Sequence, residues 1–486
     1  MDFLSDVKPV LKELLDELLK KYPYASILAQ DNYAKDYSVS AQGTVIKENE
    51  LLTGRGFVVR VFDEEIAEFS FNDISKGTLG MILTKIERNL SQLKANVPGL
   101  IHRKKIKVNK LFIEKLDGVD KIEFDKSTPF EIDPRTVKDK DVVKKLTKAS
   151  EAGRALKYDN ANVIDCQVRF NYQCIDKLFL SKNKDLRQHI TWTVGAFVTI
   201  VERDGKIKTG YKPFSLLGGA EILDKLKEGA KSAIDRAVLL LDAEPITPGT
   251  YECITSPAVT GMIVHEAFGH GVEMDMFMKD RALAKHYINK RVASDLITMH
   301  DSALASEDPT YNNVATYFFD DEGTLPKDTI IIEKGILKRG MCDLVSAINL
   351  NKASTGNGRR ESYSRKAYTR MTNTYFEGGT DSVEDMIKSV KYGFLLEDPS
   401  NGMEDPKNWG IQCMVNTARE IKDGKLTGKV FSPIVLTGYV PDLLKSVSML
   451  SPFDSLGGSG FCGKGYKEWV KVSDGGPYMK AKITLG

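Results

Sequence analysis

The segment Val264-His-Glu-Ala-Phe-Gly-His-Gly-Val-Glu-Met-Asp275 is the most informative stretch of this chain. It holds two of only 6 histidines in 486 residues, His265 and His270, and Glu266 follows the first. Neutral imidazole is a strong ligand for zinc and similar metals, and a carboxylate beside it can move a proton. The segment therefore predicts a metal site. The alternative is a pair of helix histidines that only satisfy local hydrogen bonds.

The spacing of the two histidines is incompatible with a regular helix around one metal ion. In the zinc-protease pattern His-Glu-x-x-His, the ligands lie four residues apart on one helical face. Here the separation is five, which at roughly 100° per residue turns the second side chain about 140° away from the first. Gly269 and Gly271 flank His270, and glycine ends helices and permits unusual backbone angles. We expect His270 on an irregular exit from the helix, or a local bulge between the histidines.

A third ligand is needed, because a catalytic zinc site commonly has three protein ligands and one open position. From the residues alone, Glu273, Asp275 and a distant cysteine are all candidates. The 6 cysteines include no Cys-x-x-Cys pair, which argues against a structural zinc ribbon. Five of them lie in apolar, strand-like contexts, whereas Cys462 lies in the glycine-rich segment 455–466. The alternative for Cys462 is a surface thiol in a hairpin.

The histidine segment resembles the signature of the TldD/PmbA family of zinc metallopeptidases. Other stretches resemble family motifs in the same order, namely Phe319-Asp-Asp-Glu-Gly-Thr324, Gly356-Asn-Gly-Arg-Arg-Glu-Ser-Tyr363, Thr369-Arg-Met-Thr-Asn-Thr-Tyr375 and Cys462-Gly-Lys-Gly465. The resemblance covers most of the chain and is strongest from about residue 250 onward. One departure follows Cys462-Gly-Lys464, where the family usually continues Asp-Gly-Gln and this chain reads Gly-Tyr-Lys.

The resemblance implies a ligand set and an activity. His265, His270 and Cys462 are expected to hold a divalent metal, with Zn²⁺ the expected ion, and Glu266 is expected to be the general acid/base. The expected reaction is hydrolysis of peptide bonds in short or unfolded peptides. PmbA-like (TldE) members usually lack the His-Glu-x-x-x-His segment, so this chain resembles the TldD branch. A dimer is also implied, either with itself or with a PmbA/TldE-like subunit that lacks the motif.

Four further residues are candidates for supporting roles. Glu273 and Asp275 are expected to orient the histidines, or alternatively to cap nearby backbone. Arg360 and Arg370 are candidates for binding a carboxylate or a backbone carbonyl of the substrate. Structural ion pairs are the alternative for both arginines.

A second function fits part of the pattern: a metal-stabilised, non-catalytic subunit that binds unfolded peptides, for example by adding a strand to a sheet edge. Glu266 separates the two hypotheses, because a purely structural metal site has no use for a carboxylate beside its ligand. A nucleic-acid-associated regulator rests only on the basic run at 103–110. That run lacks an adjacent aromatic platform and is better explained as a solvated linker or strand.

Composition agrees with a cytoplasmic enzyme. Apolar residues make up 42% of the chain and charged residues 28%, as in ordinary globular proteins. A net charge of +2 is too balanced to imply a nucleic-acid or membrane partner. Charged residues near the N-terminus argue against a signal peptide. The sequence has no run of 18 apolar residues, so we expect no membrane span. Scattered cysteines suit a reducing cytoplasm.

We expect an α+β fold in two parts. A mixed N-terminal domain spans residues 1–245, with a subdivision near 100–140, and a strand-rich C-terminal domain spans residues 246–486 and carries the metal site. Apolar spacing predicts helices from Phe3 to Leu18 and at 77–93, 138–156 and 220–241. Strands are expected at 24–30, 37–42, 57–62, 67–71, 163–170, 177–180 and 189–202. Pro245 and Pro248 mark the boundary.

Overall fold

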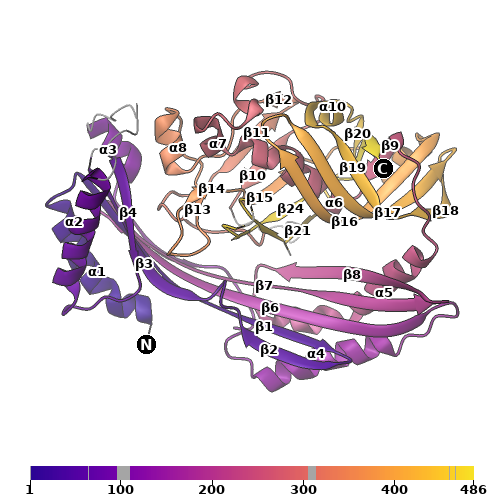
Figure 1. Ribbon diagram of the computed structural model, residues 1–486, viewed down its shortest axis with the longest axis horizontal. Helices are drawn as coiled ribbons and strands as arrows, with labels where there is room; N and C mark the ends of the chain where they lie inside the picture. The colour runs from indigo at the N-terminus through magenta and orange to yellow at the C-terminus, as the bar shows by residue number, and fades with distance from the viewer. Residues whose placement is uncertain (1, 64, 96–109, 305–312, 459, 466) are drawn as a thin grey trace.

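Apolar and alternating residues between positions 24 and 216 form one eight-stranded sheet, which sweeps along the lower part of the molecule (Figure 1). The computed structural model describes residues 2–63, 65–95, 110–304, 313–458, 460–465 and 467–486. Antiparallel pairing joins three long strands at the centre of the sheet, and β5 pairs in parallel with β7 at one edge. The strands are β1 (Tyr24–Ser40), β2 (Gly43–Glu48), β3 (Gly54–Asp63), β4 (Glu65–Phe71), β5 (Ile122–Ser127), β6 (Asn162–Ser181), β7 (Lys184–Arg203) and β8 (Lys206–Leu216).

Helices cover two separate parts of this sheet (Figure 1). The leucine-rich face of α1 is buried against β1 and β3, as the apolar spacing predicted, because that stripe recurs every three to four residues. At the other end of the sheet, α4, η1 and α5 cover β6 to β8. The helices are α1 (Phe3–Leu19), α2 (Leu79–Ala95), α3 (Lys110–Asp117), α4 (Asp139–Arg154), η1 (Ala220–Glu228) and α5 (Gly229–Leu241).

Several strand predictions were too short, for a physical reason. The segments 24–30 and 37–42 belong to the single strand β1, and 163–170 and 177–180 belong to β6. Asp31 and Asn32 look like a turn signal, but Asp31 forms a bidentate pair with Arg55 across the strands. A partner on the neighbouring strand thus stabilises a polar residue in the middle of a strand. The strands β2, β5 and β8 were not predicted, and the basic run at 103–109 lies outside the described residues.

The predicted helix at 220–241 is divided in two. Its first part, η1, is a 3₁₀ helix and its second part, α5, is an α-helix that begins at Gly229. The ring of Phe197 lies 2.2 Å from the position of a Cβ on Gly229, so the chain approaches the sheet too closely there for any other residue.

The described residues of the C-terminal part form two larger sheets and two short strand pairs. The seven-stranded sheet consists of β9 (Gly249–Thr255), β16 (Tyr392–Asp405), β17 (Gly410–Lys422), β18 (Lys425–Phe431), β19 (Ile434–Tyr439), β20 (Met449–Leu450) and β25 (Met479–Leu485). The six-stranded sheet consists of β10 (Met299–Ser302), β11 (Asp328–Glu333), β12 (Ile336–Leu337), β15 (Asn373–Phe376), β21 (Ser455–Gly457) and β24 (Ser473–Gly476). The pairs are β13 (Gly358–Arg359) with β14 (Tyr368–Thr369), and β22 (Phe461–Cys462) with β23 (Val470–Lys471).

Short helices lie among these sheets and carry the histidine segment. They are α6 (Pro257–Met262), η2 (Ile263–Gly269), η3 (His270–Val272), α7 (Met274–Met278), η4 (Leu283–His286), α8 (Leu344–Asn349), α9 (Val383–Lys388) and α10 (Val440–Lys445). This mixture of helices and strands confirms the predicted α+β class. Among the described residues, the eight-stranded sheet ends at position 216 and the other sheets begin at 249. A division at residue 245 stays a prediction.

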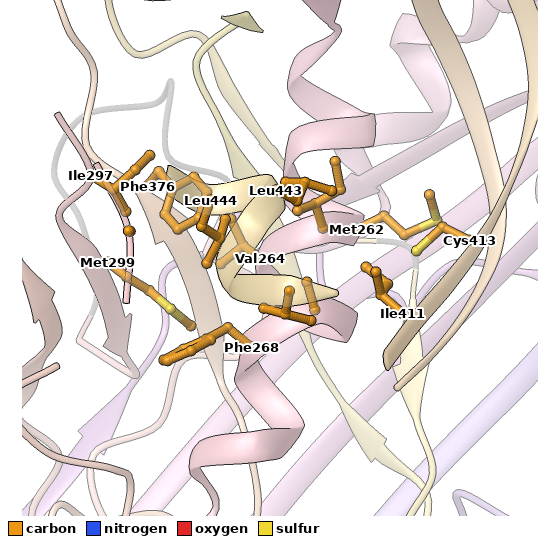
Figure 2. Close-up of a cluster of buried hydrophobic side chains, with 14 of the residues drawn as sticks. Met262, Val264, Phe268, Ile297, Met299, Phe376, Ile411, Cys413, Leu443 and Leu444 are labelled. Carbon is orange, nitrogen blue, oxygen red and sulfur yellow. The ribbon is translucent and has the colours of Figure 1, made fainter. Parts of the chain in front are cut away.

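The largest apolar cluster surrounds the histidine segment and fixes its position (Figure 2). Met262, Val264 and Phe268 point from α6 and η2 into this cluster. Full burial of each such side chain stabilises the fold by roughly 1.5–3 kcal/mol. The other labelled residues of the cluster come from β10, β15, β17, α10 and the segment before β10. They are Ile297, Met299, Phe376, Ile411, Cys413, Leu443 and Leu444. The segment that carries the histidines is therefore a buried internal element.

A buried group of charges, here called the junction network, joins the eight-stranded sheet to the C-terminal part. It consists of Arg60, Glu68, Glu322 and Arg360. Arg60 Nη2 lies 2.7 Å from carboxylate oxygens of both Glu68 and Glu322, and Arg360 Nη2 lies 2.9 Å from Glu68. Burial alone would raise the pKa of the Glu68 carboxyl. The guanidinium groups of Arg60 and Arg360 outweigh that effect and hold the pKa at about 2. Two of the sequence motifs, 319–324 and 356–363, thus contribute to this junction.

No helix among the described residues is both long and apolar enough to cross a membrane.

Candidate metal centre

A π-helical turn resolves the five-residue spacing of the two histidines. The backbone N–H of His270 donates to the carbonyl of His265, a bond that closes one turn over five residues. Both imidazoles therefore project to the same side, with ring centroids 5.1 Å apart and planes nearly perpendicular at 88°. Of the two arrangements expected from the sequence, the structure shows the local bulge. Such π turns occur frequently at functional sites.

The glycines beside His270 allow close packing and do not adopt unusual backbone angles. Gly269 has a helical φ of −57°. A Cβ on Gly269 would lie 2.2 Å from Met371 Sδ, and one on Gly271 would lie 2.4 Å from Glu404 Oε1. The expectation that these glycines relax the backbone was therefore wrong. They allow two neighbouring side chains to contact the π turn directly.

Cys462 meets the two histidines from a distant part of the chain. Its Sγ lies 3.4 Å from His270 Nε2, and one donor atom from each of the three residues lies within 4.8 Å of the others. These three residues are called the His–Cys triad below. Cys462 is only 5% exposed, so it is not a surface thiol. The pairing of β22 with β23 fixes the strand that carries it.

The triad fits a zinc ion in both geometry and chemistry. Zinc bonds imidazole nitrogen at about 2.0 Å and thiolate sulfur at about 2.3 Å, so its ligands lie within roughly 4 Å of one another. The three donors need to approach only slightly. His265 Nδ1 is buried without a hydrogen-bond partner among the described residues. Although burial opposes ionisation, the two imidazoles hold the pKa of the Cys462 thiol well below its usual range. The thiolate is the form that binds a metal.

Glu266 lies beside the triad, where the sequence placed a candidate base. Its Oε2 is 3.9 Å from His270 Nε2, and the side chain is half-buried. Burial raises the pKa of Glu266, and the two histidines oppose that shift. Space for the carboxylate comes from Gly402 on β16, since a Cβ there would lie 2.4 Å from Glu266 Cγ.

Glu273 lies next to the Nδ1 atom of His270. Asp275 contacts no histidine among the described residues. Glu273 Oε2 is 3.5 Å from His270 Nδ1 and 2.9 Å from Lys464 Nζ. Despite its burial, Lys464 and His270 hold the pKa of Glu273 well below its usual range. Asp275 lies 2.8 Å from Lys464 and 3.0 Å from Lys279. Lys464, from the Cys462-Gly-Lys-Gly motif, therefore connects the cysteine loop to the histidine segment.

The two candidate arginines occupy different places. Arg370 is fully buried and donates 2.7 Å to the carbonyl of Cys462, with its Nε 3.5 Å from Glu273. It therefore braces the loop that carries the cysteine. Arg360 belongs to the junction network and donates to the carbonyl of Arg365. These contacts favour the ion-pair alternative over substrate binding for both residues.

Two acidic residues near the triad were missed from the sequence. Asp474 Oδ1, on β24, would lie 2.7 Å from a Cβ on Gly261, one helical turn before His265. Burial raises the pKa of Asp474 to about 6, and His265 opposes the shift. Both carboxylate oxygens of Glu404, on β16, are buried without a hydrogen-bond partner among the described residues. Both residues reach the site through sheet pairing, so no local spacing pattern indicates them.

A family model described as the PmbA/TldA metallopeptidase C-terminal domain matches residues 248–484. A metalloprotease from Methanothermobacter thermautotrophicus is 29% identical over 310 residues, which span 63% of this chain and 66% of the relative. A metalloprotease from Methanocaldococcus jannaschii is 26% identical over 97% of this chain and 99% of the relative. A zinc metalloprotease TldD homolog from Saccharolobus solfataricus is 31% identical over 234 residues, 48% of this chain and 51% of the relative.

The fold is also similar to solved structures. TldE from Thermococcus kodakarensis superposes with a TM-score of 0.73 at 16% identity, covering 97% of this chain and 99% of TldE. A protein from Bacteroides thetaiotaomicron, described as a candidate modulator of DNA gyrase, superposes with a TM-score of 0.74 at 14% identity, covering 99% of each chain. At these identities the likeness concerns the fold alone.

Proposed function

Because the chain belongs to the TldD/PmbA family, we propose that it is a metallopeptidase that hydrolyses peptide bonds in short or unfolded peptides. The observation that carries the proposal is the meeting of the His–Cys triad around one point, with Glu266 beside it. We propose Zn²⁺ as the ion, because two imidazole nitrogens and one thiolate sulfur are ligands that zinc prefers. The zinc metalloprotease name of the Saccharolobus relative supports this choice.

His265, His270 and Cys462 would hold the ion, which when bound lowers the pKa of a water molecule and polarises the scissile carbonyl. Glu266 accepts the proton of the attacking water on its carboxylate. It then delivers that proton to the nitrogen of the leaving amine. The space beside Gly402 lets the carboxylate lie close to His270 without displacing it.

Neighbouring side chains hold the ligands in place. Glu273 accepts the Nδ1–H of His270, which leaves Nε2 facing Cys462. Arg370 and Lys464 fix the cysteine loop from the other side. The ligands therefore approach the ion from a rigid turn and a braced loop, so little rearrangement accompanies metal binding.

The alternative function is a metal-stabilised subunit that binds peptides without cleaving them. It needs the triad but has no role for Glu266. The room made for Glu266 by a glycine on a neighbouring strand favours the catalytic proposal.

We further propose that the chain acts as a dimer in the cytoplasm, with itself or with a TldE-like subunit. The similarity in fold between this chain and TldE supports the choice of a TldE-like partner. Six free, buried cysteines fit a reducing compartment.

The test is cleavage of a pool of unstructured peptides, read by mass spectrometry at equal zinc loading. Glu266→Gln keeps the size of the side chain but removes the base. Turnover should fall by about 10²–10⁴-fold, while zinc content and peptide binding stay unchanged. The matched control is Glu252→Gln, a half-exposed glutamate on β9 that pairs with Lys480.

Equal cleavage by the wild type and Glu266→Gln would remove Glu266 from the mechanism. Peptide binding without cleavage by the wild type, also with a TldE-like subunit present, would favour the peptide-binding alternative.

A further inference from the structure

A cavity of about 80 Å³ lies between the eight-stranded sheet and the C-terminal part. Its walls include Trp192 of β7 and both Phe461 and Lys471 of the β22–β23 pair. Phe461 and Lys471 are register partners, and neighbouring residues of a strand point to opposite faces. The residues that line the cavity include none of His265, Glu266, His270 and Cys462. The cavity is separate from the proposed zinc site.

Two cations that line the cavity have no ion-pair partner among the described residues. Arg359 donates only to backbone, to the carbonyls of Met371 at 2.5 Å and Lys471 at 2.7 Å. Lys471 Nζ donates 3.0 Å to the carbonyl of Gly460. The ammonium also lies 4.5–5.1 Å from the ring centroids of Phe461 and Trp192.

The other two cations that line the cavity are neutralised. Lys177 pairs with Asp321, and Arg360 pairs with Glu68 in the junction network. Arg359 and Lys471 are therefore the two lining cations without an ion pair among the described residues.

Three carboxylates also line the cavity, and each has other partners. Asp321 pairs with Lys177, Glu361 lies 3.5 Å from Arg365, and Asp320 accepts backbone N–H groups of Glu322, Thr324 and Gly358. Asp301, which attracts Arg359, accepts hydrogen bonds from Asn357 and Thr372. Asp474 attracts Lys471 but also interacts with His265. Burial and the repulsion from Arg359 outweigh that attraction and hold the pKa of Lys471 well below its usual range. A bound anion would offset this penalty and favour the charged form of Lys471, because a buried cation is stable only when it is paired.

The size and geometry of the cavity define the class of anion. A planar guanidinium matches the two oxygens of a carboxylate, and an ammonium adds a compact charge. A water molecule needs roughly 10–15 Å³ of such volume, so 80 Å³ accepts a carboxylate group with a few further atoms.

We propose that this cavity binds the carboxylate group of a small organic acid between Arg359 and Lys471. The bound acid joins β13 to the β22–β23 pair, which carries Cys462. It therefore stabilises the strand pair beside the triad without entering the triad itself.

The test uses acetate as the probe, on the intact zinc-loaded protein. Thermal unfolding is measured in acetate against chloride at equal ionic strength, and calorimetry gives the dissociation constant. In the wild type, acetate should raise Tm with saturation, because it binds only the folded state. Lys471→Met should weaken acetate binding at least ten-fold, and it should not lower Tm without acetate, since Lys471 has no ion pair to lose.

Control variants distinguish binding in the cavity from binding elsewhere on the protein. Lys480→Met removes a buried lysine that already pairs with Glu252, so it should keep the acetate effect. Acetate bound to the zinc ion would persist in Lys471→Met, whereas acetate in the cavity would not. Lys471→Arg retains the charge and should retain binding, which keeps the test valid if the methionine variant fails to fold.

No acetate-specific shift in the wild type, or an equal shift in Lys471→Met, would overturn the proposal. Stabilisation by inorganic phosphate without any by acetate would overturn the carboxylate assignment.

Discussion

The junction network and the metal centre are both buried and ionisable, yet they differ in how their ionisable groups are matched. In the junction network every charged group lies within 2.9 Å of an opposite charge. At the metal centre, His265 Nδ1 and both oxygens of Glu404 are buried without hydrogen-bond partners among the described residues. Arg60 Nη1, Arg360 Nε and Glu322 Oε1 of the junction network also lack a described hydrogen bond, but each belongs to a side chain that forms an ion pair. The junction network thus balances its charges within the chain, whereas the metal centre keeps a buried imidazole nitrogen without a described partner, as the proposed zinc ion requires.

The largest effect is expected from breaking the charge-balanced cluster. Arg60→Met leaves the carboxylates of Glu68 and Glu322 buried without that counter-charge, which should destabilise the protein by about 3–5 kcal/mol. Urea unfolding measures the change. The control is Lys20→Met, which removes an exposed pair with Glu17 and should cost under about 0.5 kcal/mol. Similar losses in the two variants would contradict the distinction between buried and exposed pairs.

Filling the space beside the metal centre should have the next largest effect. A Cβ on Gly402 would lie 2.4 Å from Glu266 Cγ, so Gly402→Ala should displace the proposed base and destabilise the fold by about 1–3 kcal/mol. Turnover should fall at least ten-fold while zinc remains bound. Gly438→Ala, where a Cβ meets nothing within 4 Å, is the matched control. Full activity in Gly402→Ala would show that the position of Glu266 does not matter.

Loosening one ligand should weaken metal binding without abolishing it. Glu273→Gln removes the charge that faces His270 Nδ1 but keeps the shape of the side chain. Zinc affinity should fall about 10–100-fold, measured by competition with a chelator. Asp275→Asn, which changes a carboxylate that contacts only lysines, should alter the affinity less. An equal loss in both variants would indicate a general loss of structure.

The smallest effect is expected at a partly exposed cluster, where solvent screens the charges. Burial disfavours the charged imidazolium of His300, but hydrogen bonds to Asp328 and Glu377 hold its pKa above the usual value. This stabilisation is complete below the unfolded pKa of about 6.5 and is lost as pH rises through the raised folded pKa. It should stay under about 1 kcal/mol, because both carboxylates are exposed. Urea unfolding of the wild type and His300→Gln should therefore differ at pH 6 and converge at high pH, whereas a constant difference would contradict the account.

Local residue patterns indicated His265, Glu266 and His270, because the chemistry needs those residue types close together in the chain. The family resemblance added Cys462, which lies 192 residues beyond His270. Spacing alone left a bulge as one of two options, since Met371 and Glu404, which pack against Gly269 and Gly271, come from distant parts of the chain. The local pattern also predicted that strands end next to residues such as Asp31. The partner of Asp31, Arg55, lies on another strand. What was missed depends on contacts between distant segments.

The most direct test of the central claim is the metal content of purified wild type and of Cys462→Ser. Cys413→Ser, which changes a buried cysteine of β17 in the apolar cluster, is the matched control. If His265, His270 and Cys462 share one ion, wild type and Cys413→Ser should each contain one zinc per chain. Cys462→Ser should lose it, with an affinity loss larger than the roughly 10–100-fold expected for an outer residue. Stoichiometric zinc retained in Cys462→Ser, or no metal bound by the wild type, would contradict the account.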